Sequence, residues 1–302
     1  FKNYEDVASG TVSLNSLNDN EKNMLTMMQE IESAFRLKNY LSVKKYFTKE
    51  AYDMLDTLVR NAKISVVGNQ QYEFITLNNR VTLCRDIDLR FQFKNYVSFI
   101  RELVFRFDND KKLITSLSFR LDSDAENDIM KKGRWSEDCR YTLLNFMEDY
   151  QTAYALKRYD YLESIFSDDA LIIVGHVLKR TVLPDQMTLN LSEEEVRLMK
   201  YNKETYFNNL SRVFAEQEYI DIKFTETDFT RQLNSLDANK TGGEDIFGVR
   251  LLQEYNSTDY GDKGYLFLMV DLRDQEHPVI HVRAWQPDKV DINKLIGLTD
   301  LK

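Results

Sequence analysis

The chain contains nearly the same stretch of eighteen residues twice. "AFRLKNYLSVKKYFTKEA" runs from residue 34 to 51, and "AYALKRYDYLESIFSDDA" runs from 153 to 170, an offset of 119. Six aligned positions are identical: Ala34/Ala153, Leu37/Leu156, Lys38/Lys157, Tyr40/Tyr159, Phe47/Phe166 and Ala51/Ala170. Chance gives roughly one identity in such a window at ordinary residue frequencies. The repeat predicts a duplicated domain, and the length of 302 residues gives each copy enough chain for its own core.

Apolar residues upstream of both copies follow the period of an α-helix. The residues Met24, Met28, Ile31 and Phe35 step by four, three and four, and the same offset pairs them with Leu143, Met147, Tyr150 and Tyr154. Each half is therefore predicted to open with an amphipathic helix. Asn18 with Glu21 has capping-box spacing in the first copy, and Ser136 before two acidic residues suits a helix start in the second. A short second helix is expected over 40–47 and 159–166.

Downstream, each half changes to alternating, β-rich runs. Strands are expected at 63–68, 80–93, 98–107 and 112–121 in the first half, and at 170–175, 219–224, 246–255, 264–272 and 278–285 in the second. Because the glycine that ends the first strand is offset by only 107, the segment 50–62 is interpreted as a helical insertion. Helices are also expected at 192–202, where Ser192 and Glu195 have capping-box spacing, and at 203–216.

These elements predict an α+β fold of two tandem cone-shaped domains, each a leading helix pair packed on a curved antiparallel sheet. The segment "AYALKRYDYLESIFSDDALIIVG" resembles the nuclear transport factor 2-like superfamily, which includes ketosteroid isomerase and scytalone dehydratase. The expected boundaries are a polar leader at 1–19, domain 1 at 20–122, a linker at 123–135, domain 2 at 136–289 and a tail at 290–302.

Composition and motifs narrow the function. A net charge of -9 repels phosphate backbones, so no nucleic-acid partner is expected. Cys84 and Cys139 are too few for a four-ligand zinc site, and His277 and His281 lie about 13 Å apart on a strand. The sequence lacks a Gly-rich phosphate loop, His-Glu-x-x-His, Cys-x-x-Cys and Gly-x-Ser-x-Gly. We therefore expect no metal and no cofactor.

The first residue is Phe1, and a polar stretch follows it. A removed export signal or lipoprotein anchor is one explanation, and the choice of expressed segment is the other. The chain is similar to tandem proteins that bacteria export, which implies a periplasmic or cell-surface location. Membrane tethering is expected only through a removed N-terminal segment.

One strand of the second half carries the main ligand-binding candidates. His281, Arg283 and Trp285 alternate with Ile280, Val282 and Ala284. If the polar side looks into the cone, it lines a pocket for an anionic or aromatic ligand, together with Tyr150 and Tyr154. The preferred interpretation is that the apolar side faces the helices and the polar side lies outside.

The resemblance implies a catalytic alternative, because the family's enzymes use an acid or a histidine on the inner sheet surface opposite a tyrosine. The weak candidates for such a catalytic pair are Tyr154 together with either His281 or Asp221. The adjacent residues Asp168 and Asp169 are interpreted as a turn. The preferred function is a non-enzymatic exported binding or scaffold protein, with a small molecule or protein partner at domain 2. The alternatives are an isomerase or dehydratase type of enzyme in that cone, and a surface glycan-binding subunit that uses Tyr255, Tyr260 and Tyr265.

Overall fold

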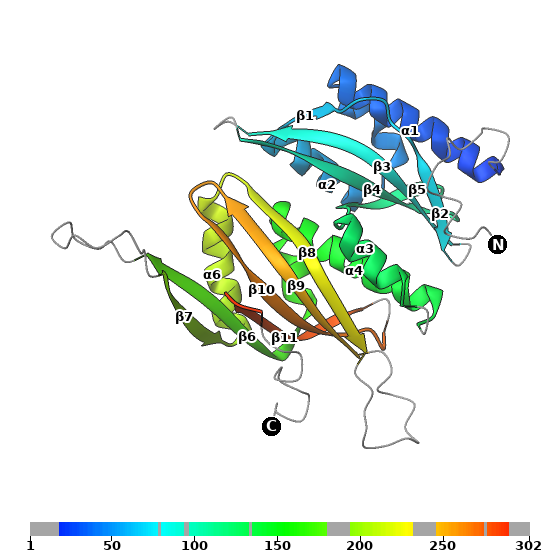
Figure 1. The fold of residues 1–302 in the computed structure, drawn as a ribbon. Coiled ribbons are helices and arrows are strands. Elements are labelled where there is room, and N and C mark those ends of the chain that lie inside the picture. The colour runs from blue at the N-terminus through cyan, green and yellow to red at the C-terminus, as the bar shows by residue number, and fades with distance from the viewer. Residues whose placement is uncertain are drawn as a thin grey trace. The chain divides into compact units, whose positions relative to one another are not determined.

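The computed structural model describes residues 18–77, 80–93, 97–132, 135–179, 194–231, 246–274 and 277–289. The predicted tail and nearly all of the predicted leader lie outside these ranges. The chain divides into unit 1, Phe1–Arg120 with Met147–Thr152, and unit 2, Leu121–Phe146 with Ala153–Lys302. Each unit combines helices with its own sheet, which confirms the predicted α+β class (Figure 1).

Unit 1 opens with three helical segments. Helix α1 (Asp19–Leu37) begins with the predicted capping box, in which Asn18 and Glu21 each accept a hydrogen bond from the other's backbone N–H. Its buried stripe includes Met24, Met28 and Ile31, as the period predicts. The 3₁₀ helix η3 (Tyr40–Tyr46) and helix α2 (Lys49–Asn61) follow.

The sheet of unit 1 is antiparallel. Its strands are β1 (Lys63–Val66), β2 (Glu73–Leu77), β3 (Val81–Gln92), β4 (Ser98–Asp108) and β5 (Leu113–Phe119). The order is β1-β3-β4-β5, and β2 also pairs with β3. The three long predicted strands are confirmed, whereas β2 was not predicted.

Unit 2 is larger. Its helices are α3 (Ser123–Met130), α4 (Glu137–Ala155), α5 (Tyr159–Ser164) and α6 (Lys203–Glu216). Its strands are β6 (Phe166–Lys179), β7 (Glu194–Tyr201), β8 (Ile220–Arg231), β9 (Ile246–Ser257), β10 (Gly261–Asp271) and β11 (Val279–Gln286). The order is β7-β6-β11-β10-β9-β8, with a parallel pairing between β6 and β11. Helix α6 lies behind this sheet in Figure 1.

Helix α4 differs from α1, its counterpart in the repeat. The residues Leu143, Leu144, Phe146, Met147, Glu148 and Tyr150 are all buried, so α4 is enclosed around most of its circumference rather than along one stripe. The segment Met147–Thr152 belongs to unit 1, while both ends of the helix belong to unit 2.

Three local predictions are wrong. The predicted helix at 192–202 is strand β7, because pairing of Glu194–Tyr201 with β6 overrides the local capping signal. The acidic pair Asp168 and Asp169 lies inside β6 with both residues exposed, not in a turn. The segment interpreted as a linker contains α3, whose N-cap Asp122 accepts a hydrogen bond from the Asp124 backbone N–H.

The repeat encodes the same helix end in both copies. Lys38 has φ 59° and Lys157 has φ 52°, so both adopt the left-handed conformation that ends a helix. The next backbone N–H, of Asn39 or of Arg158, closes a bond to the carbonyl five residues back, at 3.0 and 2.8 Å. Both lysine ammonium groups then donate to a backbone carbonyl, that of Ile64 in unit 1 and that of Gln217 in unit 2.

Strand pairing also corrects the interpretation of α2. Strand β1 pairs with β3 as β8 pairs with β9, both antiparallel. The repeated phenylalanines make the same parallel contact, Phe47 with Ile114 and Phe166 with Ile280. Helix α2 is thus the counterpart of α6 and not an insertion. The additional element is in unit 2, where β6 pairs with β7 before α6, whereas in unit 1 the corresponding position at Phe47 is an isolated bridge. The glycine offset wrongly indicated an insertion, because it aligned β1 with β6. These two strands do not occupy the same position in the two units.

Candidate functional site

The inner face of the unit 2 sheet carries polar and aromatic side chains beneath α6. Arg283 on β11 pairs with Leu268 on β10, which places both side chains on one face. The Arg283 guanidinium lies 5.4 Å from the ring centroid of Tyr206 on α6. Arg283 therefore faces the helix, and the preferred prediction that the polar side lies outside is wrong.

The opposite face of this part of the sheet is buried as well, which explains the error. On the opposite face Ile246, Phe267, Met269 and Val282 form a buried cluster, with Ala284 packed against it. Alternation along β11 therefore offers two faces that are suited to burial. It does not indicate which of them the helices cover.

Tyr206 connects three elements of the inner face. Its hydroxyl lies 2.6 Å from that of Tyr154 on α4, and both side chains are buried. Burial raises the pKa of Tyr255 on β9 to about 12, and the charge of Tyr206 adds to this rise. Tyr255 is therefore neutral at pH 7 and acts as a hydrogen-bonding group, not as a base.

Trp285 lies against the backbone of both neighbouring strands. A Cβ on Gly175 would sit 2.0 Å from the Trp285 ring, and a Cβ on Gly264 would sit 2.4 Å from it, so only glycine leaves room at either position. Trp285 is 3% exposed. Within the described part of the chain its buried Nε1 has no hydrogen-bond partner, and the adjacent ring atom Cε2 lies over Gly264.

Asp262 is a half-buried polar group on the same face, because it pairs with Tyr255 across the strands. Its Oδ2 accepts a hydrogen bond of 2.8 Å from the Tyr260 hydroxyl, while its buried Oδ1 has no partner among the described residues. Burial raises the pKa of Asp262, and the charge of Arg283 opposes that rise. The face thus offers an unused donor, Trp285 Nε1, and an unused acceptor, Asp262 Oδ1.

The other predicted site residues lie elsewhere. A bulge at His281 interrupts the regular alternation of β11. The His281 side chain therefore does not lie beside Arg283, and its Nε2 is 3.4 Å from Asp271 Oδ2. Asp221 lies between Ile220 and Ile222, and since Ile222 pairs with Tyr255, Asp221 projects from the opposite face. Tyr150 is fully buried in the α4 segment that belongs to unit 1.

The hairpin tyrosines do not form one flat surface. The rings of Tyr255 and Tyr260 are 6.0 Å apart and tilted by 54°. Tyr265 projects from the other face, where its hydroxyl donates to Glu226 at 3.0 Å.

Tyr206 and Asp262 were not predicted as site residues. Tyr206 gives no signal beyond the amphipathic pattern of α6. Asp262 falls between the strands expected at 246–255 and 264–272, whereas in the structure it already belongs to β10.

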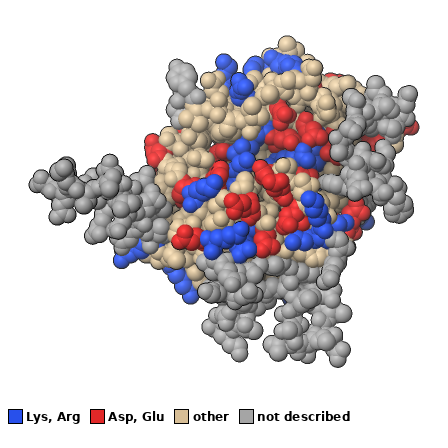
Figure 2. Space-filling model, viewed as in Figure 1, with Lys and Arg blue, Asp and Glu red and all other residues tan. Residues whose placement is uncertain are grey.

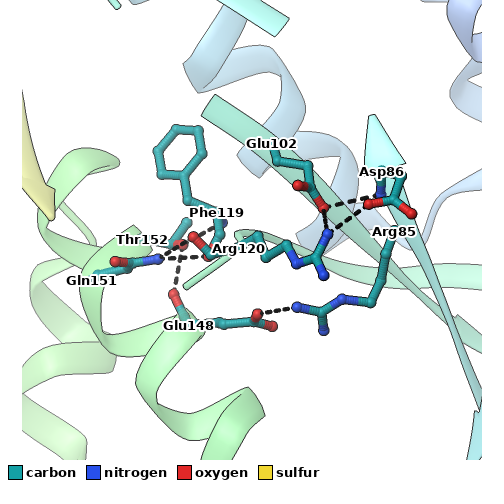
Figure 3. A network of polar contacts seen from close by, with 8 residues as sticks. All are labelled: Arg85, Asp86, Glu102, Phe119, Arg120, Glu148, Gln151 and Thr152. Carbon is teal, nitrogen blue, oxygen red and sulfur yellow. Dashed lines mark hydrogen bonds and ion pairs between the residues drawn. The ribbon is translucent and has the colours of Figure 1, made fainter. Parts of the chain in front are cut away.

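Unit 1 contains a separate buried polar network (Figure 3). Arg85 on β3 and Glu148 form an ion pair of 2.6 Å with both side chains fully buried. One turn further along α4, Thr152 Oγ1 accepts from the Phe119 backbone N–H at 2.7 Å. Gln151 donates to the Phe119 carbonyl at 2.7 Å and to the Arg120 carbonyl at 3.0 Å. These bonds attach the segment Met147–Thr152 to the end of β5.

The outer part of this network lies at a bulge in β3. Asp86 is in the left-handed region with φ 68°, a strained conformation for a residue with a side chain. Arg120 Nη1 donates to both Asp86 Oδ1, at 2.5 Å, and Glu102 Oε1, at 2.6 Å. Burial raises the pKa of Glu102 to about 7, although Arg120 acts in the opposite direction.

Glu102 makes the stability of unit 1 depend on pH. Its pKa in the folded state is about 7, above the ordinary value of 4.5, so between these pH values the folded state binds more protons than the unfolded state. The free energy of unfolding should therefore fall as the pH rises from about 4.5 to about 7 and then level off. We expect Glu102→Gln to remove this slope. The measurement is the urea midpoint of the wild type and of Glu102→Gln, each at pH 5 and at pH 8. If the wild type and the variant differ by the same amount at both pH values, Glu102 is not the group that makes stability depend on pH.

Within the described ranges, no three His, Cys, Asp or Glu side chains are grouped so that they could hold a metal ion. No helix in these ranges combines the length and hydrophobicity that crossing a membrane requires. Figure 2 shows acidic and basic side chains interleaved on the visible surface.

No protein-family model matches the chain, and no curated protein sequence matches it. Among solved structures, Bdellovibrio bacteriovorus Bd1075 is similar with 15% identity and a TM-score of 0.34, over 50% of this chain but only 41% of that protein. A naphthalene 1,2-dioxygenase with indole bound in the active site has 8% identity and a TM-score of 0.33, over 56% and 89% of the two chains. The beta subunit of benzoate 1,2-dioxygenase from Burkholderia mallei has 13% identity and a TM-score of 0.30, over 52% and 95%.

Proposed function

We propose that this protein is a non-enzymatic, exported binding or scaffold protein with two nuclear transport factor 2-like domains in tandem. In this proposal unit 2 holds a small aromatic anion, or a partner's side chain of the same chemistry, against its inner sheet face. The observation that carries the proposal is the convergence of Arg283, Tyr154 and Tyr206 on one buried face, next to Trp285. The exported location rests on the family resemblance alone.

The chemistry of these groups favours binding. The Arg283 guanidinium already lies over an aromatic ring, so a second aromatic group that carries a carboxylate would find both a charge and a stacking partner. The Trp285 N–H is a donor without a partner in the described part of the chain, and a carboxylate oxygen is a suitable acceptor. A buried donor is costly to leave unsatisfied, and a ligand that satisfies it gains that free energy.

The same groups are poorly suited to proton transfer. Tyr255 has its pKa raised to about 12, far from neutral pH, and His281 is turned toward Asp271. A general base works best with a pKa near the operating pH and within hydrogen-bond reach of the substrate. The geometry therefore supports recognition better than isomerase or dehydratase chemistry.

The test is a fluorescence titration of the Trp135→Phe variant with phenylacetate. The chain has two tryptophans, so Trp285 is then the only reporter. We expect a saturable change in its emission. Phenylacetamide, which lacks the charge, and cyclohexylacetate, which lacks the aromatic ring, should each bind at least about ten-fold more weakly, a loss of roughly 1.4 kcal/mol.

The variants Arg283→Gln and Trp285→Phe separate charge from shape. Arg283→Gln should weaken phenylacetate but leave phenylacetamide unchanged, because only the charged ligand uses the guanidinium. Trp285→Phe keeps an aromatic ring and removes the N–H donor, and calorimetry replaces fluorescence for this variant. Equal affinity for all three compounds, or no binding of any of them, would overturn the proposed ligand class.

A further inference from the structure

Unit 1 has a pocket of about 220 Å³ between the first half of α1 and the turn that joins β4 to β5. Its floor is apolar and is formed by Met24, Met27 and Phe107. Met24 is 5% exposed and Phe107 is fully buried, so the floor is part of the core of unit 1. Among the described residues that line the pocket, none belongs to the polar network or to the unit 2 face.

The helical period places amide groups along the edge of this floor. Asn20, Asn23, Met24 and Met27 follow the spacing i, i+3, i+4 and i+7, so they form a single stripe along α1. Asn109 completes the rim from the β4–β5 turn. A carboxamide offers two donors and an acceptor oxygen, so the rim can both donate and accept.

The remaining lining groups are two hydroxyl groups and one positive charge. Thr26 and Tyr46 contribute hydroxyl groups, and Lys112 contributes an ammonium group. Although the chain has a net charge of -9, no carboxylate is among the lining residues in the described part of the chain. Such a lining disfavours a cation, and it offers an anion only the single ammonium of Lys112, which is exposed and therefore screened by water.

The walls are held in place by contacts of their own. The Tyr46 hydroxyl donates to Glu30 at 2.7 Å, and the Lys45 ammonium lies 4.6 Å from the centroid of the Tyr46 ring. Asn109 Oδ1 accepts a hydrogen bond of 3.0 Å from the Thr82 hydroxyl. A lining that is fixed before the ligand arrives reduces the entropy cost of binding.

The volume limits the ligand to one ring. About 220 Å³ corresponds to roughly seven waters at about 30 Å³ each. Pockets for drug-sized ligands usually have about 300–1,000 Å³. A single six-membered ring with its substituents fills the available space.

We propose that this pocket binds one uncharged, hydroxyl-rich ring, that is, a single sugar unit. Each hydroxyl of a sugar both donates and accepts, which matches the carboxamides of Asn20, Asn23 and Asn109. The C–H face of the ring is apolar and packs on Met27, which Phe107 supports from the core. An aromatic ring would fill the floor equally well, but it would displace water from the exposed amides of Asn20 and Asn23 without replacing the hydrogen bonds of that water, which costs free energy.

The test is an NMR titration of the full chain with methyl α-D-glucopyranoside, methyl β-D-galactopyranoside and N-acetylglucosamine. We expect at least one of them to cause saturable shifts of the Asn20 and Asn23 side-chain amide signals at about millimolar concentration, as is usual for a small neutral ligand. Met27→Trp should fill the pocket and weaken binding at least ten-fold. Gln29→Trp is the matched control, because it adds the same ring at an exposed position of α1 outside the pocket, and it should leave the affinity unchanged.

A second variant, Asn23→Leu, keeps the shape of the rim and removes an amide, and it should also weaken the sugar at least ten-fold. The proposal is overturned if none of the three sugars causes saturable shifts, if Met27→Trp binds as tightly as Gln29→Trp, or if phenylacetate shifts these amides and the sugars do not. The readouts are amides of unit 1, whereas the function proposed for unit 2 is read from Trp285, so either can fail without the other.

Discussion

Replacing Glu148 by leucine is expected to destabilise unit 1 by about 3–5 kcal/mol. The change removes the carboxylate from the Arg85 guanidinium, which has no exposed surface and lies 2.6 Å from it. A buried charge that loses its counter-ion retains the full cost of having left water. Hydrogen exchange of the β3–β5 amides in increasing urea measures the effect on unit 1 itself, which is necessary because a chain of two units need not unfold in one transition.

The double variant Arg85→Met/Glu148→Leu is the control. Replacing a buried ion pair by apolar side chains of similar volume is often neutral, so we expect the double variant to recover most of the lost stability. Additive losses in the two single variants and the double variant would show that packing, and not charge pairing, makes Glu148 important.

The second large effect is expected from adding one methyl group next to Trp285. In Gly175→Ala the new Cβ would lie 2.0 Å from the indole ring, and in Gly264→Ala it would lie 2.4 Å from it. Either the ring or a strand must move, and we expect each variant to lose about 3 kcal/mol, the upper end of the usual cost of overpacking. The measurement is the urea midpoint, followed by the emission of Trp285 in a Trp135→Phe background.

Gly261→Ala is the matched control, because it lies on the same strand as Gly264 and its new Cβ would lie 3.3 Å from the nearest side-chain atom, the Asn256 Oδ1. It should change stability by less than about 1 kcal/mol. Combining Gly175→Ala with Trp285→Leu should cost less than the sum of the two single changes, because the smaller side chain removes the clash. A strictly additive pair would mean that Trp285 does not occupy the space beside Gly175.

Local features of the fold could be predicted from the sequence. The capping box at Asn18, the apolar stripe of α1 and the left-handed ends at Lys38 and Lys157 depend on residues within one or two helical turns. The long strands β3, β4 and β5 were also predicted, since alternation is a property of the strand itself. The duplication is likewise visible in the residues alone, since it needs only the comparison of one stretch of chain with another.

The site could be predicted only in part. Arg283 and Trp285 were identified from their alternation, but the choice of the face that α6 covers was wrong, because Val282 and Ala284 are equally suited to burial. Tyr206 and Asp262 were missed, since nothing local marks a tyrosine on an amphipathic helix as the partner of Tyr154. The pairing of Arg85 with Glu148 spans 63 residues and leaves no local pattern.

By itself, then, the sequence determined most of the helices, the main strands and their repetition, because these depend on the chemistry of neighbouring residues. The tertiary structure decided that 194–201 is a strand, that α2 corresponds to α6, and which side chains meet beneath α6. Each of those outcomes depends on hydrogen bonds and packing between distant segments. Their free energies exceed local preference and appear only when the partner segments are in place.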